Sequence, residues 1–205
     1  MGRHAEKRRY LIKRKYWYES VMRAIRATRL WLERVVIGLS LCPWARPPYE
    51  RGGVRIATTE ASTPEDLSVA LFREIALLQH EAETPPETSI LVCPQAFPED
   101  FVAFAEFVAD AEELIRLKDL DDEYQLVAFH PQFRFADEDA DDASNFVNRS
   151  PYPALHILTQ QSVTQAVDLQ SELAESTPTT NQALLRKLGA EHMRRRVDAT
   201  IADAA

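Results

Sequence analysis

The chain of 205 residues is 45% hydrophobic and 27% charged, a composition typical of one globular domain and not of a disordered or fibrous protein. Its two cysteines lie far apart and form no CxxC pair, which argues against a zinc ribbon or a thioredoxin-type site. No apolar run is long enough to span a bilayer, and no secretory signal is recognisable. We therefore expect a cytoplasmic protein without a transmembrane segment.

The net charge of −8 is distributed unevenly along the chain. Residues 1–34 carry eleven Lys or Arg against three Glu, whereas the rest of the chain carries thirteen against twenty-nine acidic residues. An acidic body argues against nucleic acid as the main partner of the protein.

The first element in chain order is an amphipathic helix. Apolar residues recur at helical spacing over residues 17–41, and Pro43 ends the pattern. Residues 44–53 are rich in Pro, Gly and Arg and are expected to form a loop.

Three strand-then-helix units follow. The strands are predicted at Val54–Thr59, Ser89–Cys93 and Tyr124–His130, so that their starts recur at intervals of about 35 residues. A fourth short strand is predicted at Ala154–Leu158. This rhythm is typical of βαβ units. We predict an α/β fold with a small mixed, mainly parallel four-stranded sheet and helices packed on it.

The rhythm breaks at residues 131–153, hereafter the 131–153 loop. Loops of this length in a compact domain are usually functional or disordered, and the aromatic and proline residues of this one favour an ordered loop. Ligands of open α/β sheets bind at the carboxyl ends of the strands, where this loop begins. If the fourth strand runs antiparallel to the third, His156 should lie near His130. The polar residues expected to bind substrate are Arg149, Asn145, Asn148, Ser150 and Tyr152.

Several chemistries remain open for these residues. His130, His156 and a carboxylate from Asp141 or Asp142 would form a divalent metal site. The hypothesis that we favour is an enzyme acting on a small anionic or polar substrate, in which His130 or His156 acts as an acid–base catalyst and the planar guanidinium of Arg149 holds an anionic group.

Other hypotheses assign these residues no catalytic role. Cys42 near a helix C-terminus is a poor nucleophile, because that position raises a thiol pKa. If the site were structural, Arg149 would only pair with the loop aspartates and hold the loop in place, and His156 would be a hydrogen-bonded core histidine. The protein would then bind a ligand or partner through the 131–153 loop without catalysis.

Three segments resemble motifs of the family called domain of unknown function 1415 (DUF1415). They are Trp31–Ala45, Phe129–Phe135 and Asn145–His156. The resemblance spans roughly Thr28 to Gly189 and implies that the three motifs belong to one domain. It implies no activity, cofactor or catalytic residue.

The domain division follows from this resemblance. We expect a basic N-terminal extension at 1–27, a single α/β domain at 28–189, and a mobile helical tail at 190–205. The extension interleaves Lys and Arg with Tyr10, Tyr16, Trp17 and Tyr18, a composition suited to RNA or an anionic membrane surface. A solvated tail is the alternative, and Met22 is a candidate start of the natural protein.

Overall fold

The structure is a computed structural model that describes residues 2–79, 86–169 and 171–205. Side chains are described for these residues except at 2–14 and 165–175. Most basic residues of the expected N-terminal arm therefore have side chains outside the described part. Within the described residues, no helix is both long enough and apolar enough to cross a membrane.

Four strands form one sheet in the order β1-β2-β4-β3. Their bounds are β1 Val54–Thr58, β2 Thr88–Val92, β3 Tyr124–Phe129 and β4 Ala154–Thr159. β2 pairs in parallel with β1, whereas β4 runs antiparallel to both of its neighbours, β2 and β3. All five residues of β2 are buried, as expected for a central strand.

The prediction of a mainly parallel sheet was wrong, because one strand pair is parallel and two are antiparallel. The sequence interval between the first three strands did predict their common direction. However, β4 enters the sheet between β2 and β3 and separates them. The 131–153 loop stays at the edge where β3 ends, so the strand that follows it must run back in the opposite direction.

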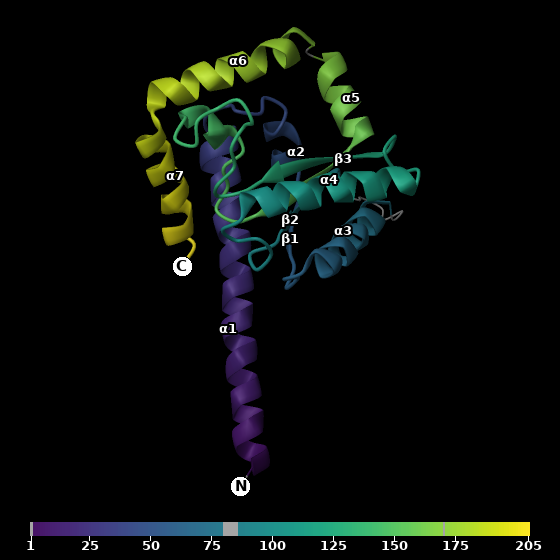
Figure 1. The fold of residues 1–205 in the computed structure, drawn as a ribbon, viewed down its shortest axis with the longest axis vertical. Coiled ribbons are helices and arrows are strands. Elements are labelled where there is room, and N and C mark those ends of the chain that lie inside the picture. The colour runs from purple at the N-terminus through teal and green to yellow at the C-terminus, as the bar shows by residue number, and fades with distance from the viewer. Residues whose placement is uncertain (1, 80–85, 170) are drawn as a thin grey trace.

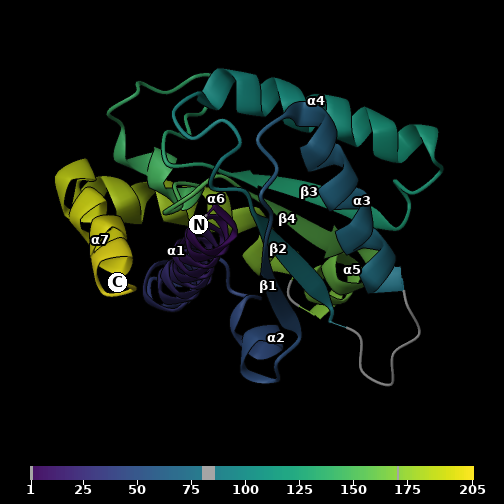
Figure 2. The same cartoon turned by 90° about the horizontal axis from the view of Figure 1, so that it is seen from below.

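One face of the sheet is covered by α3 (Pro64–Gln79) and α4 (Phe101–Leu117), as Figure 2 shows. Asp100 caps α4 by accepting a hydrogen bond from the Ala103 amide at 3.0 Å. The apolar residues of these helices meet alternate residues of the strands, including Leu126, Leu155 and Ile157, in one buried cluster.

The other face is covered by the end of α1 (Gly2–Trp31) and by the π-helical turn η1 (Leu32–Ile37). The helix predicted from residue 17 thus starts earlier and changes its hydrogen-bond pattern before it ends. Figure 1 shows the N-terminal part of α1 projecting away from the rest of the molecule. A short helix, α2 (Arg46–Glu50), occupies the segment that was expected to be a loop.

Three helices complete the chain: α5 (Gln160–Leu169), α6 (Ser171–Leu188) and α7 (Ala190–Ala202). We expected residues 190–205 to be mobile, but α7 buries Met193, Val197 and Thr200. It packs against α1 and η1, and Arg34 of η1 pairs with Asp203, just after α7, at 2.5 Å. The apolar residues of α7 recur at the spacing of a helix that packs on one face. The charged residues between them made this spacing hard to recognise in the sequence.

Candidate functional site

The candidate site lies at the edge where β1, β2 and β3 end and β4 begins, hereafter the carboxyl edge. The 131–153 loop is ordered there and contains a 3-10 helix, η2 (Ala143–Val147), that packs against α6 and α7. Asp142 caps η2 by accepting a hydrogen bond from the Ser144 amide at 2.7 Å. Arg186 of α6 pairs with Asp142 at 3.0 Å and with Glu138 at 2.8 Å. The loop is therefore tied down at several points.

Two predicted substrate-binding residues form hydrogen bonds within the loop. The buried Asn145 side chain accepts a hydrogen bond from the Phe135 amide at 3.0 Å and donates one to the Asp139 carbonyl at 2.8 Å. The buried Ser150 hydroxyl donates to the Tyr152 carbonyl at 2.6 Å. These polar groups are already satisfied within the loop.

Asn148 contributes through its backbone, because its carbonyl accepts a hydrogen bond from the His130 amide at 3.1 Å. Tyr152 is partly buried and packs against the apolar cluster beside α1. Neither residue lines the pocket of about 550 Å³ that lies beside Arg149.

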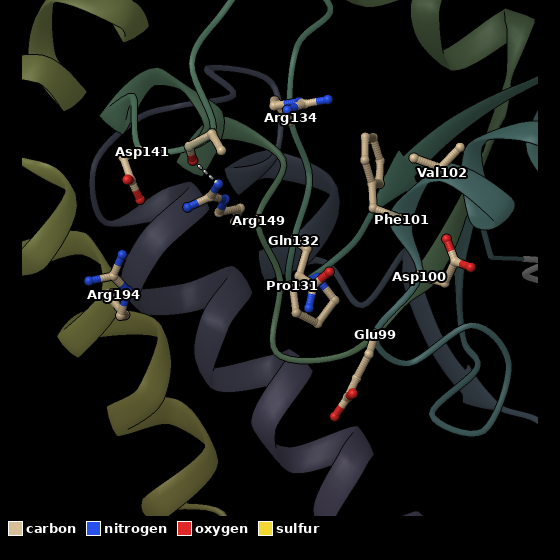
Figure 3. Close-up of a pocket in the computed structure, with 11 residues that line it drawn as sticks. Glu99, Asp100, Phe101, Val102, Pro131, Gln132, Arg134, Asp141, Arg149 and Arg194 are labelled. Atoms are coloured by element: carbon tan, nitrogen blue, oxygen red, sulfur yellow. Dashed lines mark hydrogen bonds between the residues drawn. The ribbon is translucent and has the colours of Figure 1, made fainter.

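Arg149 is held in a fixed position on the loop. Its Nε donates to the Phe133 carbonyl at 3.0 Å, and one Nη donates to the Ala140 carbonyl at 2.6 Å. The guanidinium also lies over the Phe146 ring, 4.8 Å from its centroid. Its other Nη points toward Asp141 and Arg194 (Figure 3). Within the described part of the chain, no carboxylate lies within ion-pair distance of Arg149.

Arg149 lines a pocket of about 550 Å³ at the carboxyl edge (Figure 3). Loop residues Gln132 and Arg134 and the α7 residue Arg194 line it as well. The start of α4 supplies Glu99 and Asp100, together with apolar surface from Phe101 and Val102. The volume is in the usual range for a small-molecule site, about 300–1,000 Å³.

The charges around Arg149 are not balanced. Burial lowers the pKa of Arg149, and the positive charge of Arg194 lowers it further. Asp141 acts in the opposite sense with a smaller effect on this pKa. An arginine remains charged in such surroundings, so this end of the pocket is cationic.

His130 borders the pocket but does not open into it. The side chain is fully buried between the rings of Phe101 and Phe104, with centroids 5.5 and 5.3 Å away. Its Nδ1 accepts from the Gln132 amide at 3.0 Å, and its Nε2 donates to the Phe97 carbonyl at 2.8 Å. Burial lowers the pKa of His130, which favours this neutral form.

His156 does not meet His130, although β4 has the required antiparallel direction. Its neighbours Leu155 and Ile157 face α3 and α4, so His156 points to the opposite face, where its ring stacks on Phe129 at 5.9 Å. The His156 Nε2 shares a hydrogen bond with the Thr88 hydroxyl at 2.7 Å. Burial lowers the pKa of His156 to about 4. The alternation of side chains along a strand separates the two histidines.

This separation removes the geometric basis for the expected two-histidine metal site. Asp142 is already engaged by Ser144 and Arg186, and Asp141 lies near Arg149. Among the described residues, no three His, Cys, Asp or Glu side chains are grouped so as to hold a metal ion.

Both cysteines are free thiols. The Cys93 thiol donates to the Pro153 carbonyl at 3.2 Å, and burial raises its pKa to about 12. Burial also raises the pKa of Cys42. Neither thiol is placed to act as a readily ionised nucleophile.

Residues 23–195 match the family described as "Protein of unknown function (DUF1415)". The chain belongs to this family. Comparison with curated proteins and with solved structures found no match. The DUF1415 match includes all three motifs that carried the resemblance, and it extends beyond Gly189 into α7.

Five charged or polar residues of the pocket were missed by sequence reasoning: Glu99, Asp100, Gln132, Arg134 and Arg194. Arg194 was missed because α7 had been assigned to a mobile tail. The apolar spacing of Met193 and Val197 was the available signal, since it predicts a packed face beside Arg194. Arg194 lies inside the DUF1415 match, which agrees with α7 being part of the domain.

Proposed function

We propose that the pocket at the carboxyl edge binds a small molecule through an anionic group, a carboxylate or a phosphate, between Arg149 and Arg194. The observation that carries this proposal is the fixed, partly buried guanidinium of Arg149 beside a second guanidinium. Two like charges repel each other, and an anion between them would relieve that repulsion.

The anchoring of Arg149 also supports a binding role. Its hydrogen bonds to the Phe133 and Ala140 carbonyls hold the planar group in one orientation. A preorganised donor loses little conformational entropy when a ligand arrives. The exposed Arg194 pairs only with Glu191 of its own helix, at 3.0 Å, among the described residues. Such an exposed pair is weak and exchanges readily for a ligand anion.

The contacts of the histidines favour binding over the acid–base enzyme that the sequence suggested. Both ring nitrogens of His130 already have partners, and His156 lies on the other face of the sheet. A general base needs a nitrogen within reach of the substrate proton. Neither histidine offers such a nitrogen to the pocket in this conformation.

The test is an NMR titration of the arginine side chains with inorganic phosphate and, separately, with valerate. We expect saturable shifts of the Arg149 and Arg194 resonances. Arg194→Ala should weaken binding about tenfold, the effect of losing one charge-assisted contact. Arg195→Ala is the matched control, because Arg195 also pairs with Glu191 but does not line the pocket.

Arg194 is a better test residue than Arg149, whose side chain also holds the loop. If neither anion shifts the resonances of Arg149 and Arg194 at tens of millimolar, the proposal is wrong. An equal loss of affinity in Arg194→Ala and Arg195→Ala would also contradict it, since net charge alone would then explain binding.

A further inference from the structure

The pocket carries opposite charges on two walls. Arg149 and Arg194 lie on one wall together with the single carboxylate of Asp141, so this wall keeps a net positive charge. Glu99 and Asp100 lie on the other wall, at the start of α4 (Figure 3). Pro131 lies between the two walls in the same view. A ligand that fills the pocket would meet a cationic end and an acidic end.

The acidic wall is not neutralised by the protein. Within the described part of the chain, neither Glu99 nor Asp100 has a basic group within ion-pair distance. One Asp100 oxygen accepts from the Ala103 amide, which leaves the second oxygen for another donor. Both residues are exposed and line the pocket, so a ligand cation could replace the water around them.

Apolar surface also lines the pocket. Phe101, Val102 and Pro131 line the pocket, and Val102 is 62% exposed. An exposed valine at the start of a helix is free to contact a short aliphatic chain. The site therefore offers a cationic, an apolar and an acidic region within about 550 Å³.

We infer that the ligand is a small aminocarboxylate, whose carboxylate binds between Arg149 and Arg194 and whose ammonium group lies against Glu99 and Asp100. This inference rests on the proposed anion site and names its ligand class. The volume suits an amino acid or a short peptide. The apolar chain between the two charges would cross Pro131, which lies between the two walls.

The experiment compares matched pairs of probes that differ only in the ammonium group. The pairs are β-alanine and propionate, γ-aminobutyrate and butyrate, δ-aminovalerate and valerate, and ε-aminocaproate and caproate. Dissociation constants are measured by NMR titration of the full-length protein. At one chain length or more, the aminocarboxylate should bind about fivefold more tightly than its partner, the upper range for an exposed ion pair.

A double variant locates the ammonium group. Glu99→Gln with Asp100→Asn removes both charges, while Asn keeps the helix cap. The advantage of the aminocarboxylate should disappear in this variant, and binding of the plain carboxylate should persist. Glu106→Gln with Asp110→Asn is the control, because it makes the same change of charge on exposed positions of α4 outside the pocket.

The outcomes separate the two proposals. If plain carboxylates bind as tightly as aminocarboxylates at every chain length, the inference is overturned and the anion site stands. An advantage that survives in the Glu99 and Asp100 double variant also overturns it. If no carboxylate of either kind binds, the inference falls, and the phosphate titration then decides whether an anion site remains.

Discussion

The Trp31 indole donates a hydrogen bond from Nε1 to the Arg149 carbonyl at 2.9 Å. Trp31 is fully buried at the end of α1, where its ring also meets Phe129 edge-on at 5.0 Å. The bond joins residues 118 positions apart in sequence and connects the first motif of the family to the third. The backbone that carries the Arg149 guanidinium is thus fixed by the first helix of the domain.

Replacing Trp31 with Phe should destabilise the protein. The Phe ring retains much of the packing but removes the N–H, which leaves the Arg149 carbonyl without this partner. We expect the free energy of unfolding to fall by about 1–3 kcal/mol, measured by urea denaturation. Trp17→Phe, on the exposed part of α1, should change it by less than about 0.5 kcal/mol. Equal stability of Trp31→Phe and wild type would show that the bond contributes nothing.

The half-buried His156 should make stability depend on pH. Its pKa is about 4 in the folded protein and about 6.5 when unfolded, so the unfolded state binds more protons between these values. Stability is therefore fully present above about pH 6.5 and is lost as pH falls toward 4. The contribution is on the order of 3 kcal/mol.

His156→Gln should flatten this dependence in urea denaturation measured from pH 7 to pH 4. His130 retains a smaller contribution of the same sign, because burial lowers its pKa as well. His192→Gln, at an exposed position of α7, is the control and should leave the slope unchanged. A slope unchanged in His156→Gln would contradict the lowered pKa of His156.

Arg186→Ala should loosen the 131–153 loop. The substitution removes the ion pairs with Glu138 and Asp142 that tie the loop to α6. Hydrogen exchange by mass spectrometry should be faster in residues 136–144, with little change in Tm, because exposed ion pairs contribute little to global stability. Arg116→Ala, which breaks an exposed pair with Glu113 on α4, should leave exchange in the loop unchanged.

A protein that starts at Met22 should fold with an unchanged melting temperature. Residues 15–20 are exposed, and the first buried residue described in α1 is Ala24. The truncated protein keeps that residue and the contact between Arg23 and the Ile201 carbonyl. Calorimetry of both lengths tests this prediction, and a large drop in Tm would show that the projecting part of α1 stabilises the domain.

Asp141→Asn should strengthen anion binding at the pocket. The Asp141 carboxylate is close enough to raise the pKa of Arg149, so it competes electrostatically with a ligand anion. Removing its charge should tighten phosphate binding about two- to fivefold at low ionic strength, with the gain falling as salt is added. Asp137→Asn, in the same loop but not lining the pocket, is the control. Weaker binding in Asp141→Asn would mean that Asp141 contacts the ligand favourably.

The elements of the core followed from local pattern. The four strands were predicted within two residues of their observed bounds, since apolar runs bounded by turn residues define them. Thr63 and Asp100, residue types that commonly cap helices, each accept a hydrogen bond at a helix start: the Thr63 hydroxyl from the Asp66 amide at 3.2 Å and the Asp100 carboxylate from the Ala103 amide at 3.0 Å. The pairing order did not follow, because it depends on contacts between residues far apart in sequence.

The sequence alone determined the family, the four strands and the segment that carries Arg149, because these depend on short-range periodicity and on contiguous motifs. Only the tertiary structure decided which side chains share a pocket. Side chains along a strand alternate between the two faces of the sheet. His156 therefore points to the face opposite His130, whereas a shift of one residue would have turned it to the same face. Packing of α7 on α1 brought Arg194 to Arg149, a juxtaposition that no spacing along the chain encodes.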